Sequence, residues 1–271
     1  MIRLTAREDS HRRRSDTVSH LRILAVAALA GTAVTVLPAS ATAAPACDPP
    51  AAVIGLSKDW KVQLPIDDPD KSGKQPLEVK QPKFATYSKS PWFTPTAACD
   101  GIQFRAAVNG VTTSNSSYPR SELREMTDDG RDEAAWSSTS GTHTMVIDQA
   151  ITHLPKKKPH VVAGQIHDGE NDRSVFRLEG TKLYITKEND KHTLITDDYR
   201  LGTRFQAKFV VSGGNIRAYY NGELKATIPA KFSGGYFKAG AYTQANCDKS
   251  DPCESGNYGQ TVIYSVKVTH S

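Results

Sequence analysis

Short β-type runs separated by turns rich in Gly, Asn, Asp and Pro occupy most of the chain between residues 60 and 268, and long helical periodicity is absent. The turns are clearest at Ser-Gly-Gly-Asn (212–215) and Asn-Gly (221–222), which separate alternating apolar and polar runs. Many short antiparallel strands at this spacing are typical of a sandwich or jelly roll. We therefore predict an all-β fold. The expected strands are 60–65, 102–108, 142–150, 161–167, 174–178, 183–187, 205–211, 216–220, 224–228, 236–243 and 261–268.

The first 44 residues have the pattern of a bacterial-type signal peptide. Arginines at positions 12, 13, 14 and 22 accompany an apolar, alanine-rich run over 21–37, and small residues follow over 39–44. The run is shorter than the ~20 residues that a membrane-spanning helix needs. We expect cleavage near Ala43 or Ala44, with Ala41 and Ala46 also satisfying the small-residue rule. The mature protein is then expected to be secreted and extracellular, without a membrane association.

The net charge and length of the mature part, residues 45–271, narrow its possible partners and its number of domains. Removing residues 1–44 takes six Lys/Arg from 34 and three Asp/Glu from 29, so the formal net charge falls from +5 to +2. Dispersed charge near neutrality is not typical of a nucleic-acid partner, although one basic groove for an acidic polymer remains compatible with it. About 227 residues without a repeat or linker fit a single β-domain. We expect a monomer.

Four cysteines in an exported protein favour two disulfides. Sequence proximity pairs Cys247 with Cys253, which leaves Cys47 to pair with Cys99. A zinc site is the alternative, but the cysteines form no CxxC pairs and are not interleaved with suitably spaced histidines. The segment 68–73 imitates the start of an EF-hand loop, yet Val79 occupies the twelfth position, which requires a bidentate acid. We expect a polar turn there and no metal site.

Three segments carry polar side chains that alternation places on one face of an extended strand. These are Arg120, Glu122 and Arg124 in 118–126, Gln165 and His167 in 161–169, and Tyr236, Lys238, Tyr242 and Gln244 in 236–244. Gly240 lies between the lysine and the second tyrosine, where it would leave room for a ligand. Taken alone, each segment also fits a solvated strand or a structural histidine. Four histidines outside these segments, His143, His153, His160 and His192, lack a neighbour such as Gln165, and we expect no catalytic role for them.

Together and in this order, the segments resemble the alginate lyases of polysaccharide lyase family seven. The marks of that family are an R-S/T-E-L-R strand, a Q-I/V-H strand and a Y-F-K-x-G-x-Y-x-Q strand near the C-terminus, and all three are intact here. Residues 60–65 also resemble the family's first strand, so the likeness covers nearly the whole mature chain. It implies a β-jelly-roll sandwich of two antiparallel sheets, whose concave sheet forms the substrate groove.

The resemblance also implies roles for individual residues. Arg120 and Gln165 would bind and neutralise a substrate carboxylate, while His167 and Tyr242 would move protons. Lys238 would help to hold the polymer. Residues implied to line or support the binding surface are Glu122, Arg124, Tyr236 and Gln244. The implied reaction is β-elimination of alginate, a 4-linked uronate polymer, which leaves a 4,5-unsaturated uronate end and needs no cofactor.

The chemistry explains these residue types. The C5 proton of a uronate is weakly acidic because its removal places negative charge beside a carboxylate that is already anionic. The site must therefore first provide hydrogen-bond donors that neutralise this carboxylate. A base must then take the proton and an acid must protonate O4. Neutral His167 suits the base and Tyr242 the acid, although Tyr242 could perform both steps on mannuronate. In this family, isoleucine at position 166 tends to accompany acceptance of guluronate, so we expect guluronate-rich or mixed blocks to be preferred.

Three other functions are alternatives to this interpretation. A glycoside hydrolase needs a close pair of carboxylic acids, but no E-x-D-x-E strand is found, and Glu122 and Glu125 fall on opposite faces of their segment. A non-catalytic carbohydrate-binding module would explain the fold and groove without requiring His167 or Tyr242. A lyase for another polyuronate, such as glucuronan, would use the same chemistry.

Overall fold

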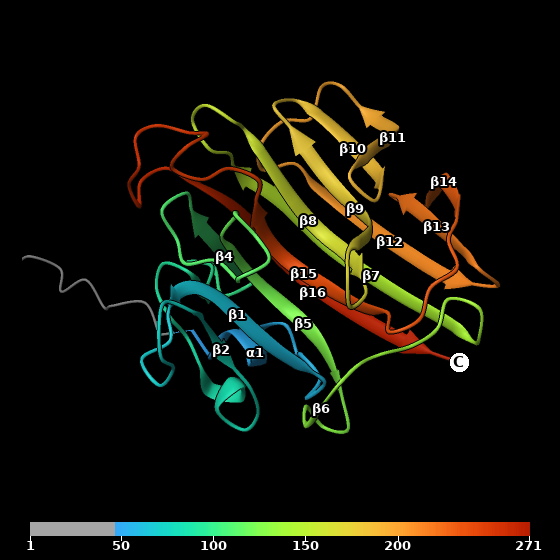
Figure 1. The fold of residues 1–271 in the computed structure, drawn as a ribbon, viewed down its shortest axis with the longest axis horizontal. Coiled ribbons are helices and arrows are strands. Elements are labelled where there is room, and N and C mark those ends of the chain that lie inside the picture. The colour runs from blue at the N-terminus through green and yellow to red at the C-terminus, as the bar shows by residue number, and fades with distance from the viewer. Residues whose placement is uncertain (1–46) are drawn as a thin grey trace, which may run out of the picture. The chain divides into compact units, whose positions relative to one another are not determined.

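Two antiparallel sheets packed face to face form the fold of residues 47–271, the part of the chain that the computed structural model describes (Figure 1). The predicted signal peptide and its cleavage site lie outside these residues. In chain order the elements are α1 (Pro50–Val53), β1 (Trp60–Asp67), β2 (Pro76–Val79), η1 (Lys83–Thr86), β3 (Phe93–Pro95), β4 (Ile102–Ala107), β5 (Arg120–Thr127), β6 (Asp132–Glu133), β7 (Thr142–His153), β8 (His160–His167), β9 (Asp172–Glu179), β10 (Lys182–Lys187), β11 (Asp190–Thr196), β12 (Arg204–Ser212), β13 (Asn215–Tyr220), β14 (Glu223–Pro229), β15 (Tyr236–Thr243) and β16 (Tyr258–His270).

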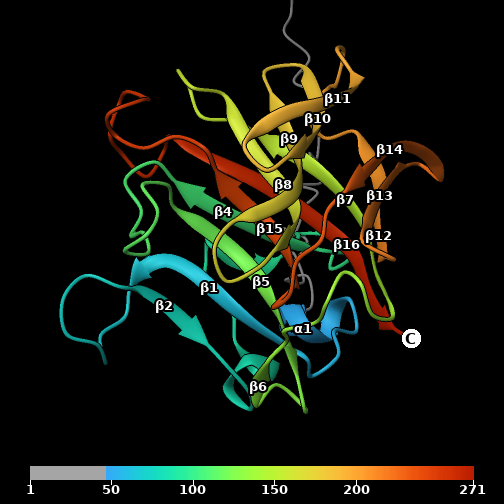
Figure 2. The same cartoon turned by 45° about the vertical axis from the view of Figure 1, so that its right-hand side comes forward.

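The order of strands brings the three polar segments together. The nine-stranded sheet runs β11-β10-β9-β8-β15-β5-β1-β2, with β6 paired to β5, and the seven-stranded sheet runs β14-β13-β12-β7-β16-β4-β3. The polar segments are therefore the adjacent strands β8, β15 and β5, as Figure 2 shows from a second angle. The predicted all-β jelly-roll sandwich is confirmed.

The core between the sheets follows the alternation of the strands. Ile166, Leu123 and Ala239 point inward from β8, β5 and β15 and are fully buried, as predicted. Phe176 and Phe209 belong to the same buried core, and their ring centres lie 4.9 Å apart. Each side chain of this size contributes roughly 1.5–3 kcal/mol on burial. Burial of the inward residues fixes the register, so the opposite residues must face the outside of the sheet.

Both predicted hairpin turns are confirmed. Gly213 and Gly214 have φ of 56° and 70° between β12 and β13, and Asn221 and Gly222 have φ of 50° and 84° between β13 and β14. Two consecutive positive φ angles are typical of the type I′ turn, whose twist matches that of the flanking strands.

Several strands differ from the predicted ones. The short strands β2, β3 and β6 and the edge strand β11 were not predicted, because each is brief or polar and is defined by its partner rather than by alternation. Strands β7 and β16 are longer than predicted. They pair with one another from Gln260 opposite His153 to His270 opposite His143, so each extends the other.

Both predicted disulfides are confirmed. Cys47 is bonded to Cys99 with Cα atoms 5.4 Å apart, and Cys247 to Cys253 with Cα atoms 4.8 Å apart. The EF-hand-like segment is the turn between β1 and β2, in which the Asp68 carboxylate accepts the backbone N–H of Asp70 at 3.1 Å. Within residues 47–271, no helix is long and apolar enough to cross a membrane.

Candidate active site

A polar pocket of about 460 Å³ lies on the outer face of the nine-stranded sheet and crosses it from β2 to β9. The predicted residues that line it are Arg120, Arg124, Gln165, His167, Tyr236, Lys238 and Tyr242. Strand pairing explains this grouping. Lys238 lies opposite Arg124 on one side and Gln165 on the other, while Tyr242 lies opposite Arg120. Because paired residues share a face, these side chains converge on one groove.

Arg120 is a buried cation without a counterion. The residue is only 9% exposed, and its guanidinium carbon lies 4.0 Å from the centre of the Tyr242 ring. Among residues 47–271 it forms no ion pair, and its buried Nε has no hydrogen-bond partner. Guanidinium keeps its charge in proteins, and a buried charge without a partner is costly. The arrangement therefore favours an anionic ligand beside Tyr242.

Glu122 lies beneath the groove rather than in it. It is fully buried, its carboxylate is 2.8 Å from Lys238 Nζ, and it accepts a hydrogen bond from Gln165 Nε2. A carboxylate can only accept, so the amide group of Gln165 must turn its nitrogen toward Glu122 and keeps one further N–H. Of the two roles implied for Glu122, lining the binding surface or supporting it, its burial favours the second, since it is not among the residues that line the groove and holds Lys238 and Gln165 in position.

Lys238 is held in an unusual electrostatic setting. The pKa of Lys238 is lowered to about 8, chiefly by burial and also by the charge of the nearby Arg120, and the opposing effect of Glu122 limits the fall. The ammonium form thus depends on Glu122, which supplies the only carboxylate paired with it among the described residues.

Gly240 serves strand packing rather than ligand access. It lies opposite Glu122 with φ of 148°, and a Cβ atom there would be 2.7 Å from the Cα of Glu122. The prediction that this glycine leaves room for a ligand is wrong, because the missing side chain points at β5 instead.

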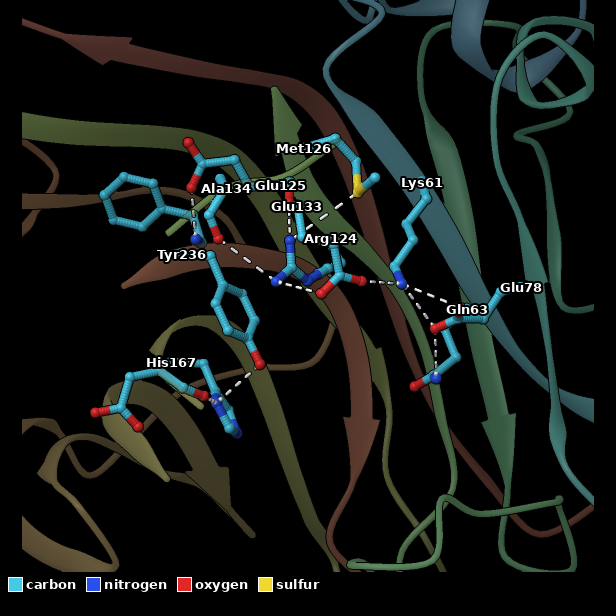
Figure 3. Close-up of polar contacts among 12 residues, drawn as sticks. Lys61, Gln63, Glu78, Arg124, Glu125, Met126, Glu133, Ala134, His167 and Tyr236 are labelled. Atoms are coloured by element: carbon cyan, nitrogen blue, oxygen red, sulfur yellow. Dashed lines mark hydrogen bonds and ion pairs between the residues drawn. The ribbon is translucent and has the colours of Figure 1, made fainter. Parts of the chain in front are cut away.

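His167 has a defined tautomer. Its Nδ1 donates to the backbone oxygen of Asp168, which can only accept, and the Tyr236 hydroxyl lies 3.0 Å from the same nitrogen (Figure 3). The proton of the neutral ring is therefore on Nδ1, and Nε2 carries a lone pair. Burial, followed by the charge of Lys238, lowers the pKa of His167 to about 4. A neutral imidazole with an available Nε2 can act as a base.

Comparison with known proteins identifies the family of this chain. The family model described as Alginate lyase (Alginate_lyase2) matches residues 54–270. The chain belongs to this alginate lyase family. The alginate lyase from Corynebacterium sp. has a similar structure with a TM-score of 0.79 and 60% identity, covering 84% of this chain and all of that one. Alginate lyase AlgAT5 of polysaccharide lyase family 7 has a TM-score of 0.77 and 49% identity over 82% and 98% of the two chains.

A third relative is the family 7 alginate lyase A1-II′, a variant of which was crystallised with a substrate, GGMG. Its TM-score is 0.70 at 26% identity, and the likeness covers 84% of this chain and 98% of that one. The enzyme class expected from the sequence, an alginate-cleaving polysaccharide lyase, is confirmed, as is its resemblance to family seven.

One end of the lyase groove contains residues that sequence reasoning missed. Lys61 donates to Glu133 at 2.8 Å and lies 3.0 Å from Glu78, while Glu133 also pairs with Arg124 at 3.1 Å (Figure 3). The Arg124 guanidinium carbon in turn lies 3.9 Å from the centre of the Tyr236 ring. Alternation over 60–65 carries a signal for Lys61, since Val62 and Leu64 are the inward residues.

Loops supply the remaining walls of the lyase groove. Ser116, between β4 and β5, places its hydroxyl 2.9 Å from that of Tyr242, and Asp172 opens β9 with a pKa that burial raises. No local pattern marks these positions, because they come close only through the fold. Gln244 follows the end of β15 and is not among the residues that line the groove, so the structure does not bring it to the site. His143, His153, His160 and His192 also lie outside the lining.

Proposed function

We propose that this lyase cleaves guluronate-rich or mixed alginate with the four residues Arg120, Gln165, His167 and Tyr242. The observation that carries the proposal is the nearly buried guanidinium of Arg120, which lies beside the Tyr242 ring and has no ion-pair partner in the described part of the chain. A uronate carboxylate would supply the missing anion, with a bidentate contact to the guanidinium. The remaining N–H of Gln165 would donate to the same carboxylate.

The elimination then requires two proton movements. His167 Nε2 takes the C5 proton, and the electrons of that C–H bond form the C4–C5 double bond as the C4–O4 bond breaks. The Tyr242 hydroxyl gives its proton to the departing O4. Donors at the carboxylate stabilise the negative charge that develops during this step, and the loss of one such donor typically lowers the rate about 10²–10³-fold.

The groove suits an acidic polysaccharide. Its lining holds four cations, which belong to Lys61, Arg120, Arg124 and Lys238, and four carboxylates, which belong to Glu78, Glu133, Glu170 and Asp172. Three of the cations are paired with carboxylates, so Arg120 is the lining cation left for a substrate carboxylate within residues 47–271. The complexes of the relative A1-II′ with the product GGG and the substrate GGMG support binding of a sugar chain here. For mannuronate, whose C5 proton lies on the other side of the ring, Tyr242 would perform both proton transfers and His167 would orient the substrate.

We further propose that the enzyme is a secreted, extracellular monomer formed by the single domain 45–271. The pattern of residues 1–44 supports export. The two disulfides also support it, since disulfides persist in oxidising compartments.

The decisive experiment incubates residues 45–271 with polyguluronate, polymannuronate, mixed alginate and a neutral glucan, and records the ultraviolet absorbance of the unsaturated product. We expect the fastest increase on polyguluronate or mixed alginate and none on the glucan. Faster turnover of polymannuronate would overturn the guluronate preference. New reducing ends without absorbance would indicate hydrolysis, and binding with neither signal would indicate a carbohydrate-binding module.

A further inference from the structure

A second pocket, of about 700 Å³, adjoins the groove beside β1 and β2. Gln63, Glu78, Thr113 and Ser116 line both pockets, so the two form one continuous trough. Ser116 marks the boundary, and its hydroxyl is 2.9 Å from that of Tyr242. A polymer that extends past the proposed proton donor would therefore enter this second pocket directly.

One wall of the second pocket is the turn between β1 and β2, which carries Lys71 and Lys74. The turn is fixed by its own hydrogen bonds. The Asp68 N–H donates to the Gln75 carbonyl at 2.8 Å, and the Gln75 N–H donates to the Asp67 carboxylate at 3.0 Å. The two ammonium groups are thus carried by a closed turn rather than by a free loop.

The facing wall is rich in hydroxyl groups. It is formed by Thr112, Thr113, Ser114, Ser116 and Ser117. The Val111 N–H anchors this segment to the Pro65 carbonyl at 3.0 Å, and Gly110 packs so closely that a Cβ atom there would lie 2.7 Å from the Cβ of Pro65. Hydroxyl groups both donate and accept hydrogen bonds, which suits the hydroxyl groups of a sugar.

The charge of the pocket favours an acidic sugar over a neutral one. Glu78, the carboxylate in its lining, is already paired with Lys61 at 3.0 Å. Lys71 lies 3.8 Å from Asp68, and Lys74 forms no ion pair within residues 47–271. The lining therefore has surplus positive charge, carried by the exposed Lys71 and Lys74.

We propose that this second pocket is an additional subsite that binds a uronate beyond those at the cleavage point. Lys74 and Lys71 attract its carboxylate, and the hydroxyl wall contacts its ring. The inference rests on the proposed alginate chemistry. It adds a dependence on chain length: long chains reach the subsite, and the shortest cleavable oligomers do not.

The test compares KM and kcat of the Lys71→Ala/Lys74→Ala double variant on long polyguluronate and on the shortest oligoguluronate that the wild type cleaves. Losing two exposed charge contacts is expected to raise KM for the long chain by about three- to tenfold, with KM for the short oligomer and both kcat values unchanged. Lys74→Glu should raise KM for the long chain more than Lys74→Ala does. High salt should shrink the difference between wild type and variant, because exposed charges are screened.

Lys267→Ala is the matched control, because Lys267 is an exposed lysine on β16 of the other sheet and lines neither pocket. An unchanged KM for the long chain in the double variant would overturn the subsite, as would an equal rise on long and short substrates. Failure of the proposed function itself would look different: the wild type would then release no ultraviolet-absorbing product from any alginate.

Discussion

The Glu122 carboxylate lies 2.8 Å from the Lys238 ammonium group, and both side chains are buried beneath or within the groove. Of the neighbours that shift the pKa of Lys238, Glu122 is the main one that raises it, against the lowering effect of burial and Arg120. A buried charge that loses its partner tends to become neutral. The pair therefore keeps a cation available in the groove.

Glu122→Gln is expected to move the alkaline limb of kcat/KM to lower pH. Without the carboxylate, the pKa of Lys238 should fall further below about 8, so the neutral amine forms earlier as pH rises. Initial rates on polyguluronate across a pH series, at constant ionic strength, would measure this shift. Urea unfolding of the same variant checks that the fold survives, and an unmoved alkaline limb in a folded variant would contradict the role given to Glu122.

The pH profile of the wild type should be bounded by two groups of the groove. His167 must be neutral to accept a proton, and its pKa of about 4 keeps it neutral down to that pH. Lys238 must be charged to hold a carboxylate, and its pKa is about 8. We expect kcat/KM to fall below pH about 4 and above pH about 8. An acid limb near the value of ~6.5 for a solvated histidine would show that His167 is not desolvated during turnover.

Tyr242→Phe and His167→Ala should each reduce kcat by about 10²–10⁴-fold, the range typical for loss of a positioned acid or base. Ser116→Ala removes only the hydroxyl that lies 2.9 Å from Tyr242, so it should cost less than about tenfold. Single-turnover rates on polyguluronate, with unfolding midpoints for all three variants, provide the measurement. Substantial activity in a folded Tyr242→Phe variant would remove tyrosine from the role of acid.

Substitution of Glu125 is expected to change the stability of the fold and not the chemistry of the groove. Glu125 is 2% exposed and accepts hydrogen bonds from Trp136 Nε1 at 3.0 Å and Phe237 N at 2.8 Å, while His270 Nε2 lies 2.6 Å away. Glu125→Ala would leave two N–H groups without an acceptor, so the free energy of unfolding should fall by about 2–4 kcal/mol. Urea titration measures the loss, and Glu133→Ala, an exposed carboxylate nearby, is the comparison. A loss no larger than that of Glu133→Ala would refute the assignment.

Alternation was sufficient to predict which face of β5, β8 and β15 each side chain occupies, since burial of Leu123, Ile166 and Ala239 permits only one register. Alternation could not predict how deeply each side chain on that face is buried. Glu122 and Arg124 share a face, yet one is covered by neighbouring strands and the other lines the groove. Nor could it find Ser116 or Asp172, because the order of strands brings them to the groove from the loop before β5 and from the start of β9.

Gly240 sets a condition for any attempt to transplant this reaction into another β-sandwich. The strands that carry Arg120 and Tyr242 pair so closely at residue 240 that a Cβ atom there would lie 2.7 Å from the Cα of Glu122. A design that copies the charged and aromatic residues but accepts alanine at that position would push β5 and β15 apart at their centre. Glu122 would then no longer be held against Lys238 and Gln165. Such a design must therefore keep glycine at position 240 as well as the reactive residues.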